Sequence, residues 1–225
     1  MDETPAGWQQ LPLFPLNNVL FPDGPLPLQI FEPRYLEMVS RCHAAGTPFG
    51  VVCLSEGREI RTPGDGGFAK ESLCPVGTLA RIDVLERPQA ALMVALCTGG
   101  QRFRIHRSAQ QRFGLWVAEV ETLVDDLPVA VPDDLAWLRD HLRALFEERQ
   151  DSASARGSGE ADTFDPLPRS PRWNDCGWLA NRWCELLPLP AAEKQRLLEL
   201  ESPLLRLELV SDALARMGLS RPRPD

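Results

Sequence analysis

Six prolines fall within the 25 residues from position 11 to position 35, and they limit the structures that this stretch can form. Two short apolar runs, at residues 11–16 and 26–30, are separated by the turn-forming sequence Pro-Asp-Gly-Pro at 22–25. Because proline has no N–H to donate to a neighbouring strand, we expect both runs to form strands that lie at a sheet edge or contain irregular turns. The stretch therefore predicts a strand, a turn and a second strand, followed by a helix that begins at Pro33.

The residues up to position 124 predict one helix and several further strands. The helix at Pro33 is expected to extend to about Ala45, where its one-sided apolar stripe ends at a glycine. A continuous apolar run at 49–54 predicts a buried strand, and the glycine-rich, polar residues 57–71 predict a surface loop. Apolar and polar residues then alternate in several segments between 76 and 124. We therefore expect about six strands in sequential antiparallel order and one helix, which suits a small barrel or sandwich.

The composition changes at Asp125, and the rest of the chain predicts helices. Helical periodicity marks a first helix at about 134–149, after which Ser, Gly, Pro and charged residues make 150–171 an expected mobile segment. A second helix is expected to end at Pro188, a third begins after it, and Ser202 is expected to cap a fourth. Their apolar faces are too extensive to remain in water, so we expect these helices to pack together.

Residues 11–35, LPLFPLNNVLFPDGPLPLQIFEPRY, resemble part of the substrate-binding N-terminal domain of Lon proteases, in the short form that bacteria also carry as a free-standing protein. The resemblance continues in order through FGVV at 49–52, VGTLARI at 76–82, RFRI at 102–105 and WLANRWCELLPLPAAEKQRLLELESPLLRL at 178–207. It covers nearly the whole chain. It implies a mixed α+β fold, in which a mostly antiparallel PUA-like β pseudo-barrel with one packed helix occupies residues 1–125. A C-terminal helical bundle, interrupted by the mobile segment, then occupies residues 126–225, and the implied role is to bind protein substrates.

Charge and composition disfavour several kinds of partner. The formal charge of −8 and the pI near 5.0 argue against nucleic acid as the main partner, because phosphate binding requires dense Lys and Arg. No apolar run approaches the roughly 20 residues that cross a bilayer, and the acidic N-terminus lacks the apolar core of a secretion signal. We therefore expect a cytoplasmic protein with no membrane partner. The six cysteines form no C-x2-C pair and are expected to be reduced, mostly buried thiols.

The sequence predicts no catalytic site, metal site or cofactor. It contains no G-x4-G-K-[ST] motif, and the resemblance stops short of the ATPase and protease parts of Lon, which excludes energy-driven proteolysis. The three histidines, at 43, 106 and 141, do not have metal-ligand spacing. Cys42 lies next to His43, but neighbouring side chains on a helix diverge, so these two residues do not form a nucleophile–base pair. We expect a non-catalytic protein.

A candidate peptide-binding site lies around the proline-rich stretch. It consists of an expected apolar groove with a polar rim, made by Pro22, Leu28, Phe31 and Phe49 for the groove and Glu32, Arg34 and Tyr35 for the rim. In the alternative interpretation, Glu32 and Arg34 cap and bridge the helix start while Tyr35 packs beneath the stretch. Edge strands broken by prolines also leave backbone groups to which an extended peptide adds as a strand. The expected partners are exposed or unfolded polypeptides, or a protease or chaperone for which this protein is an adaptor.

Two other functions remain open at this point. The first is RNA binding through a basic strand face made by Arg102, Arg104, Arg107 and Arg112. Against it, Phe103 alternates to the opposite face, so stacking and charged groups are expected on different sides, and a solvated outer face is the favoured explanation of the arginines. The second is a small-molecule regulator with a pocket beneath the proline-rich stretch. Trp173 and Trp178 are further candidates, as exposed anchors for a protein partner, although packing in the core is the favoured interpretation of the tryptophans.

Overall fold

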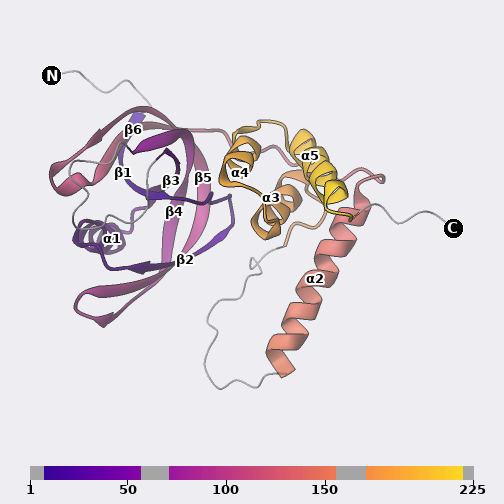
Figure 1. Cartoon of the computed structure of the whole chain (residues 1–225), viewed down its shortest axis with the longest axis horizontal. Helices are drawn as coiled ribbons and strands as arrows, with labels where there is room; N and C mark the ends of the chain where they lie inside the picture. The colour runs from indigo at the N-terminus through magenta and orange to yellow at the C-terminus, as the bar shows by residue number, and fades with distance from the viewer. Residues whose placement is uncertain (1–7, 57–70, 156–170, 220–225) are drawn as a thin grey trace. The chain divides into compact units, whose positions relative to one another are not determined.

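A computed structural model describes residues 8–56, 71–155 and 171–219, and these residues form two compact units (Figure 1). The first unit contains the described residues up to Asp125 together with Leu189–Glu199. The second contains the described residues of 126–188 and of 200–225. No helix within these described ranges is both long and apolar enough to cross a membrane.

The first unit is a six-stranded pseudo-barrel with one helix packed on it. Its strands are β1 (Trp8–Leu16), β2 (Pro25–Ile30), β3 (Phe49–Glu56), β4 (Ser72–Gln89), β5 (Leu92–Gln110) and β6 (Trp116–Thr122). Their order in the sheet is β2-β5-β4-β3-β1-β6, and β6 also pairs with β5, which closes the sheet on itself (Figure 1). All of these pairings are antiparallel except that of β1 with β3. The predicted α+β class with a mostly antiparallel barrel is confirmed.

The prolines of β1 and β2 are accommodated in different ways. β2 carries Pro25 and Pro27 and, among the described strands, pairs only with β5, so its predicted edge position is confirmed. β1 is not an edge strand. Its first half pairs antiparallel with β6 and its second half pairs parallel with β3, and only Leu13 has partners on both sides. Pro12 and Pro15 therefore each lie where β1 has a single neighbour, which leaves one side on which a missing N–H costs nothing.

The expectation of sequential antiparallel strands is wrong for β2, which pairs with neither β1 nor β3, and for β1 and β3, which pair in parallel. β1 and β2 follow each other in the chain but do not pair, because residues 17–24 carry the chain from one side of the barrel to the other. This loop is held by buried contacts: the Thr78 hydroxyl donates to Leu20 O at 2.6 Å. Gly99 forms two backbone bonds to it, accepting from Asp23 N and donating to Gly24 O, both at 2.8 Å. The loop therefore lies directly on β4 and β5.

Helix α1 has the limits that the sequence predicted, Pro33–Ala45. Pro33 occupies the first turn, where its missing N–H is not needed, and Gly46 ends the helix in the left-handed conformation at φ 63°. The stripe facing the barrel buries Tyr35, Met38, Val39 and Cys42, which join one hydrophobic cluster with residues of β1 to β5. The start of α1 is thereby fixed beside the loop 17–24 and β2.

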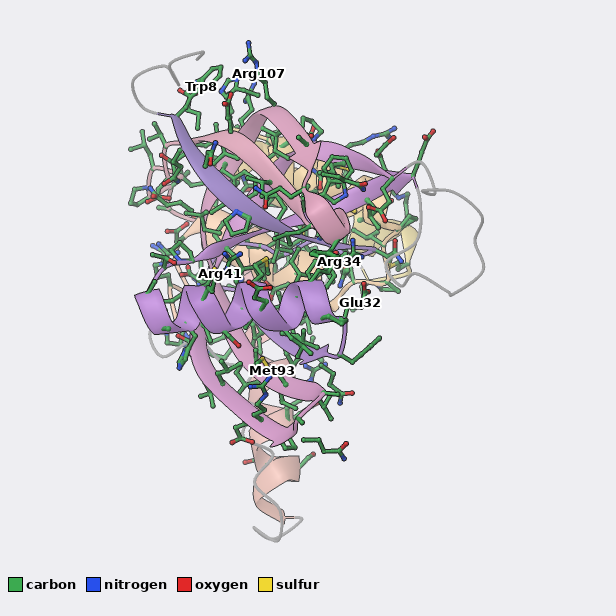
Figure 2. The ribbon with its side chains drawn as sticks, turned by 90° about the vertical axis from the view of Figure 1, so that its left-hand side faces the viewer. Trp8, Glu32, Arg34, Arg41, Met93 and Arg107 are labelled. Carbon is green, nitrogen blue, oxygen red and sulfur yellow. The ribbon has the colours of Figure 1, made fainter. Side chains whose placement is uncertain are left out.

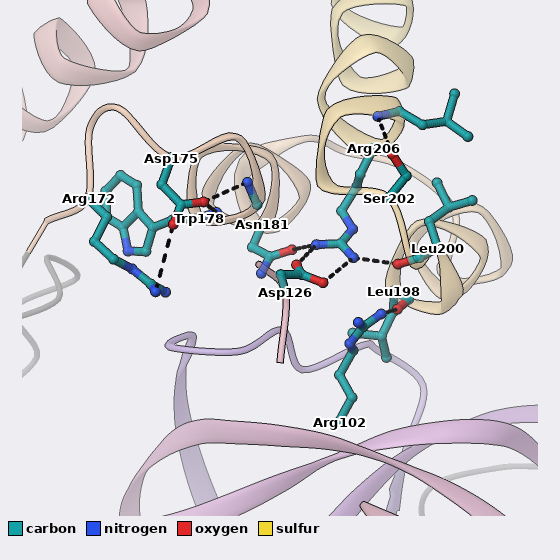
Figure 3. Close-up of polar contacts among 12 residues, drawn as sticks. Arg102, Asp126, Arg172, Asp175, Trp178, Asn181, Leu198, Leu200, Ser202 and Arg206 are labelled. Atoms are coloured by element: carbon teal, nitrogen blue, oxygen red, sulfur yellow. Dashed lines mark hydrogen bonds and ion pairs between the residues drawn. The ribbon is translucent and has the colours of Figure 1, made fainter. Parts of the chain in front are cut away.

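Helix α4 (Ala191–Glu199) belongs to the first unit, although the sequence groups it with the other C-terminal helices. Two buried polar side chains hold it there. Arg102 Nη1 of β5 donates to Leu198 O in the last turn of α4 at 2.7 Å (Figure 3). This bond satisfies a carbonyl near the helix end, where the carbonyl groups lack partners within the helix. Gln195 Nε2 donates to Val76 O of β4 at 2.9 Å. The apolar periodicity of α4 predicts neither of these long-range bonds.

The second unit is built from three helices, α2 (Ala136–Ala155), α3 (Cys176–Leu186) and α5 (Pro203–Arg216). Ser202 caps α5 as predicted, since its hydroxyl accepts from Leu205 N at 3.3 Å. Asp175 caps α3 in the same way, by accepting from Gly177 N and Trp178 N. α2 is longer than the predicted 134–149, and its last residues take up the beginning of the expected mobile segment. The rest of that segment, and most of the predicted loop at 57–71, lie outside the described residues.

Candidate functional site

Three of the predicted groove and rim residues lie in the core of the first unit. Leu28, Tyr35 and Phe49 expose 7%, 3% and 0% of their surface and belong to the cluster beneath α1. The ring of Tyr35 stacks on Phe14 with 4.2 Å between the ring centroids. A ligand reaches these side chains only if the core opens. What remains accessible of the predicted set is the partly exposed Pro22 of the loop and the residues around the start of α1.

Arg34 is the residue that organises the start of α1. Its guanidinium lies over the ring of Tyr35, 4.4 Å from the centroid, and its side chain is only 6% exposed. Nε pairs with Glu32 Oε2 at 2.9 Å, and Figure 2 shows the two residues together at the helix start. Nη1 donates to Gly114 O at 2.6 Å, although 80 residues separate the two positions. Arg34 therefore ties the start of α1 to the turn that precedes β6.

That turn contains one of two non-glycine residues with positive φ in the described part of the chain, the other being Asp23. Phe113 has φ 69° and ψ 10°, a left-handed conformation that bulky residues rarely adopt, and its side chain is 84% exposed. The turn is closed by hydrogen bonds from Gly114 N to Gln111 O at 2.9 Å and from Gln111 N to Leu115 O at 2.7 Å. Holding an L-residue in this region costs about 1–2 kcal/mol. A residue held in a strained conformation while most of its aromatic side chain remains exposed is a candidate for function.

Phe31 and Phe113 each directly precede a residue that Arg34 bonds, Glu32 and Gly114, and we call Phe31, Glu32, Arg34 and Phe113 the aromatic rim. Phe31 precedes Glu32 and is 51% exposed, while Phe113 precedes Gly114. The exposed rings supply apolar contact area, and the carboxylate of Glu32, 20% exposed, supplies a hydrogen-bond acceptor. The rim is suited to binding and offers no nucleophile or proton relay. The sequence pattern did not identify Phe113, because no periodicity links it to α1.

The predicted basic face is divided by the fold. Arg102 is 6% exposed and is occupied by its bond to Leu198 O, so it is not available on an outer surface. The side chain of Arg112 lies outside the described part of the chain. Arg104 and Arg107 are exposed on β5. The expectation of one continuous four-arginine face is therefore wrong for Arg102.

Acidic residues on the neighbouring strand offset the remaining arginines. In the β5–β6 register, Arg104 lies opposite Glu121 and Arg107 opposite Glu119. Glu121 Oε2 also lies 3.1 Å from His106 Nε2, and the ring of Trp8 stacks on His106 at 3.8 Å between centroids. Figure 2 shows Trp8 and Arg107 near each other, away from α1. Cross-strand carboxylates weaken the positive field that a phosphate backbone requires.

The tryptophan pair of the second unit is mostly internal. Trp178 is 1% exposed, so its prediction as an exposed anchor is wrong, and it packs edge-on against Trp173 with 5.2 Å between centroids. Trp173 is partly exposed, and the guanidinium of Arg143 lies 5.2 Å from its ring centroid. Across the described ranges, no three His, Cys, Asp or Glu side chains gather as a metal site requires. All six cysteines are free thiols.

Comparison with known proteins gives consistent results for nearly the whole chain. Residues 10–216 match the family described as the ATP-dependent protease La (LON) substrate-binding domain, which is a binding domain and not a catalytic one. A Lon protease from Desulfovibrio desulfuricans is 28% identical over 208 residues, which are 92% of this chain and 22% of that protein. The chain thus spans about a fifth of the length of this curated relative.

Two solved structures share the fold. The crystal structure of a Lon N-terminal domain protein from Xanthomonas campestris superposes with a TM-score of 0.66 at 25% identity, and the match covers 95% of this chain and 99% of that one. The N-terminal domain of a Lon protease from the Mycobacterium avium complex superposes with a TM-score of 0.58 at 16% identity, covering 92% of this chain and 98% of that one.

Proposed function

The chain belongs to the LON substrate-binding domain family, and on that premise we propose that it binds exposed or unfolded polypeptide segments without catalysing any reaction on them. We propose further that it acts as an adaptor, which delivers such segments to a protease or chaperone. The observation that supports the proposal best is the aromatic rim, where two exposed phenylalanines each adjoin in sequence a residue that Arg34 bonds. Unfolded chains differ from folded ones in presenting apolar side chains, and aromatic rings bind these with large contact area.

The rim also indicates how a bound segment is held. Strand addition at β2 is disfavoured, because Pro25 and Pro27 remove two N–H donors from a strand of six residues. Side-chain contacts at Phe31 and Phe113 are therefore the main source of affinity in this proposal. Such contacts accept many sequences, which suits a protein that recognises the unfolded state more than a particular motif.

Replacing both rim phenylalanines is expected to weaken binding of a labelled, reduced and alkylated protein by about tenfold or more. We suggest Phe31→Ser combined with Phe113→Asn, because asparagine tolerates the left-handed conformation and should leave the stability unchanged or higher. Fluorescence anisotropy titration measures the dissociation constant, which we expect to be in the micromolar range for the unchanged protein. Val84→Ser is the matched control, since Val84 is an exposed apolar residue of the same unit, 43% exposed, outside the rim.

Two results would contradict this proposal. One is a double variant that binds the unfolded probe as tightly as the unchanged protein and the Val84→Ser control do. The other is equal affinity of the unchanged protein for the same probe in its native, disulfide-intact state. In either case the exposed rings are not a site for unfolded chains.

Arg34→Met tests whether the arrangement of the rim matters in addition to its rings. Methionine keeps much of the side-chain volume but loses the bonds to Glu32 and Gly114 O. We expect amide exchange at Gln111 and Gly114 to become faster, and affinity for the unfolded probe to fall about fivefold, because the rim is no longer preorganised. Arg81→Met is the control, since Arg81 forms a surface ion pair with Asp83 and is 72% exposed. Faster exchange with unchanged affinity would show that the position of the turn is irrelevant to binding.

A further inference from the structure

β3 and β4 do not pair evenly, and the irregularity brings two cysteines together. Val52 lies opposite Gly77 and Leu54 lies opposite Leu73. One residue of β3, Cys53, thus faces a bulge of three residues of β4, which are Cys74, Pro75 and Val76. Pro75 cannot donate a ladder bond, which is consistent with a bulge at this position.

The two thiols face each other across the bulge and differ in accessibility. Each affects the pKa of the other, and Cys53 Sγ lies 3.6 Å from Leu54 O. Cys53 is 3% exposed, and burial raises its pKa to about 12. Cys74 is partly exposed; burial raises its pKa too, but the hydrogen bond with Cys53 opposes that rise. Cys74 is therefore the thiol that meets a solute and ionises first.

We propose that Cys53 and Cys74 form a thiol–disulfide exchange site, at which a small disulfide such as oxidised glutathione converts the two thiols into an internal disulfide. The thiolate of Cys74 attacks one sulfur of glutathione disulfide, forming a mixed disulfide and releasing one glutathione thiolate. Cys53 then loses its proton to solvent and attacks Cys74 Sγ, which releases the second glutathione. Two protein thiols are oxidised and one glutathione disulfide is reduced, so the electrons balance without another reactant.

The same bulge carries the contact that holds α4. Val76 O accepts from Gln195 Nε2 at 2.9 Å, and Gln195 Nε2 also donates to Glu199 Oε1 at 2.8 Å. Besides burial, the charge of Glu199 in the last turn of α4 also raises the pKa of Cys74. A disulfide draws the bulge of β4 towards β3 and moves the carbonyl on which Gln195 depends. Oxidation of Cys53 and Cys74 is therefore expected to loosen α4 within the first unit.

Peptide mapping by mass spectrometry tests the site on the full chain. The folded protein is incubated with oxidised glutathione, quenched in acid, alkylated and digested. We expect a linked peptide pair containing Cys53 and Cys74, with two glutathione thiols released per linked protein. Cys53→Ser should instead accumulate glutathione on Cys74, because the second attack is missing, and Cys74→Ser should form neither product. The rate should rise by about tenfold for each unit of pH, as the thiolate fraction does.

Each other outcome overturns the proposal. Glutathione that stays on Cys74 of the unchanged protein shows that Cys53 does not complete the exchange. Links that involve Cys42, Cys97, Cys176 or Cys184 show that the protein has unfolded or that a different pair reacts. If neither the unchanged protein nor Cys53→Ser is modified at any pH tested, the bulge is closed to solutes. Hydrogen exchange tests whether oxidation loosens α4, with the amides of α1 as the internal reference. If the α4 amides are as protected in the oxidised protein as in the reduced protein, the link to α4 is contradicted.

Discussion

Arg206→Met is expected to destabilise the second unit by about 3–5 kcal/mol, since it removes one partner of a buried ion pair. Arg206 is 1% exposed, and its guanidinium joins three separate segments (Figure 3). Nη1 and Nη2 bond both carboxylate oxygens of Asp126, at 2.5 and 3.4 Å. Nη1 also donates to Asn181 Oδ1 at 3.2 Å, and Nη2 to Leu200 O at 2.5 Å. Methionine fills part of the volume but leaves these oxygens without the guanidinium in a place that water reaches poorly.

Urea unfolding followed by tryptophan fluorescence measures this loss, because four of the six tryptophans lie in the second unit: Trp137, Trp173, Trp178 and Trp183. Arg41→Met is the matched control. Its ion pair with Glu37 is 4.0 Å long and both side chains are more than two-thirds exposed, so we expect a change below about 0.5 kcal/mol. Adding Asp126→Ala to Arg206→Met should cost less than the sum of the single changes, since no buried carboxylate then remains. Equal effects of Arg206→Met and Arg41→Met would refute the role assigned to this pair.

Local elements of this protein were predictable because their causes are local. Pro33 and the glycine at 46 define α1 from within the helix, and Ser202 caps α5 three residues from its bonding partner. Two prolines within β2 favour its edge position, although β1 also carries two prolines and is not an edge strand. In each case the chemistry that determines the structure lies within a few residues of the structure it determines.

The buried arginines were not predictable, because their partners are distant in sequence. Arg102 alternates with Phe103 and was expected on a solvated face, yet its acceptor is the carbonyl of Leu198, 96 residues further on. The partner of Arg206 is Asp126, 80 residues earlier. A period-two or helical pattern assigns a side chain to a face but does not state what covers that face. The same limit applies to the parallel pairing of β1 with β3, which depends on register between separate segments.

The candidate site was predicted in part, for a related reason. Phe31, Glu32 and Arg34 were recognised because they surround a helix start, but the depth of Tyr35 and Phe49 in the core depends on how closely α1 packs on the barrel. Phe113 joins the site only through the bond of Arg34 to Gly114 O. A sequence pattern marks Phe113 as one exposed aromatic residue among others, whereas the backbone conformation distinguishes it.

Gly99→Ala is expected to destabilise the first unit by about 3 kcal/mol or more, because the added methyl group has no space. A Cβ at this position overlaps the backbone oxygen of Phe21, and it lies 3.2 Å from Cγ of Leu20. Backbone atoms cannot rotate away as a side chain does, so the loop 17–24 must move off the sheet. The two bonds that Gly99 forms with Asp23 N and Gly24 O, each 2.8 Å long, are then stretched or lost.

Gly100→Ala is an adjacent control with the same chemical change. A Cβ there lies 3.5 Å from the nearest atom, Leu79 O, which is an ordinary van der Waals distance, so little loss of stability is expected. Urea unfolding followed by far-ultraviolet circular dichroism compares the variants, and hydrogen exchange at Asp23 reports the loop directly. Since the loop leads into β2 and on to Phe31, Gly99→Ala should also weaken binding of unfolded chains at temperatures where the protein stays folded. If both alanine variants unfold alike and Asp23 stays protected, the close approach of this loop does not support the barrel.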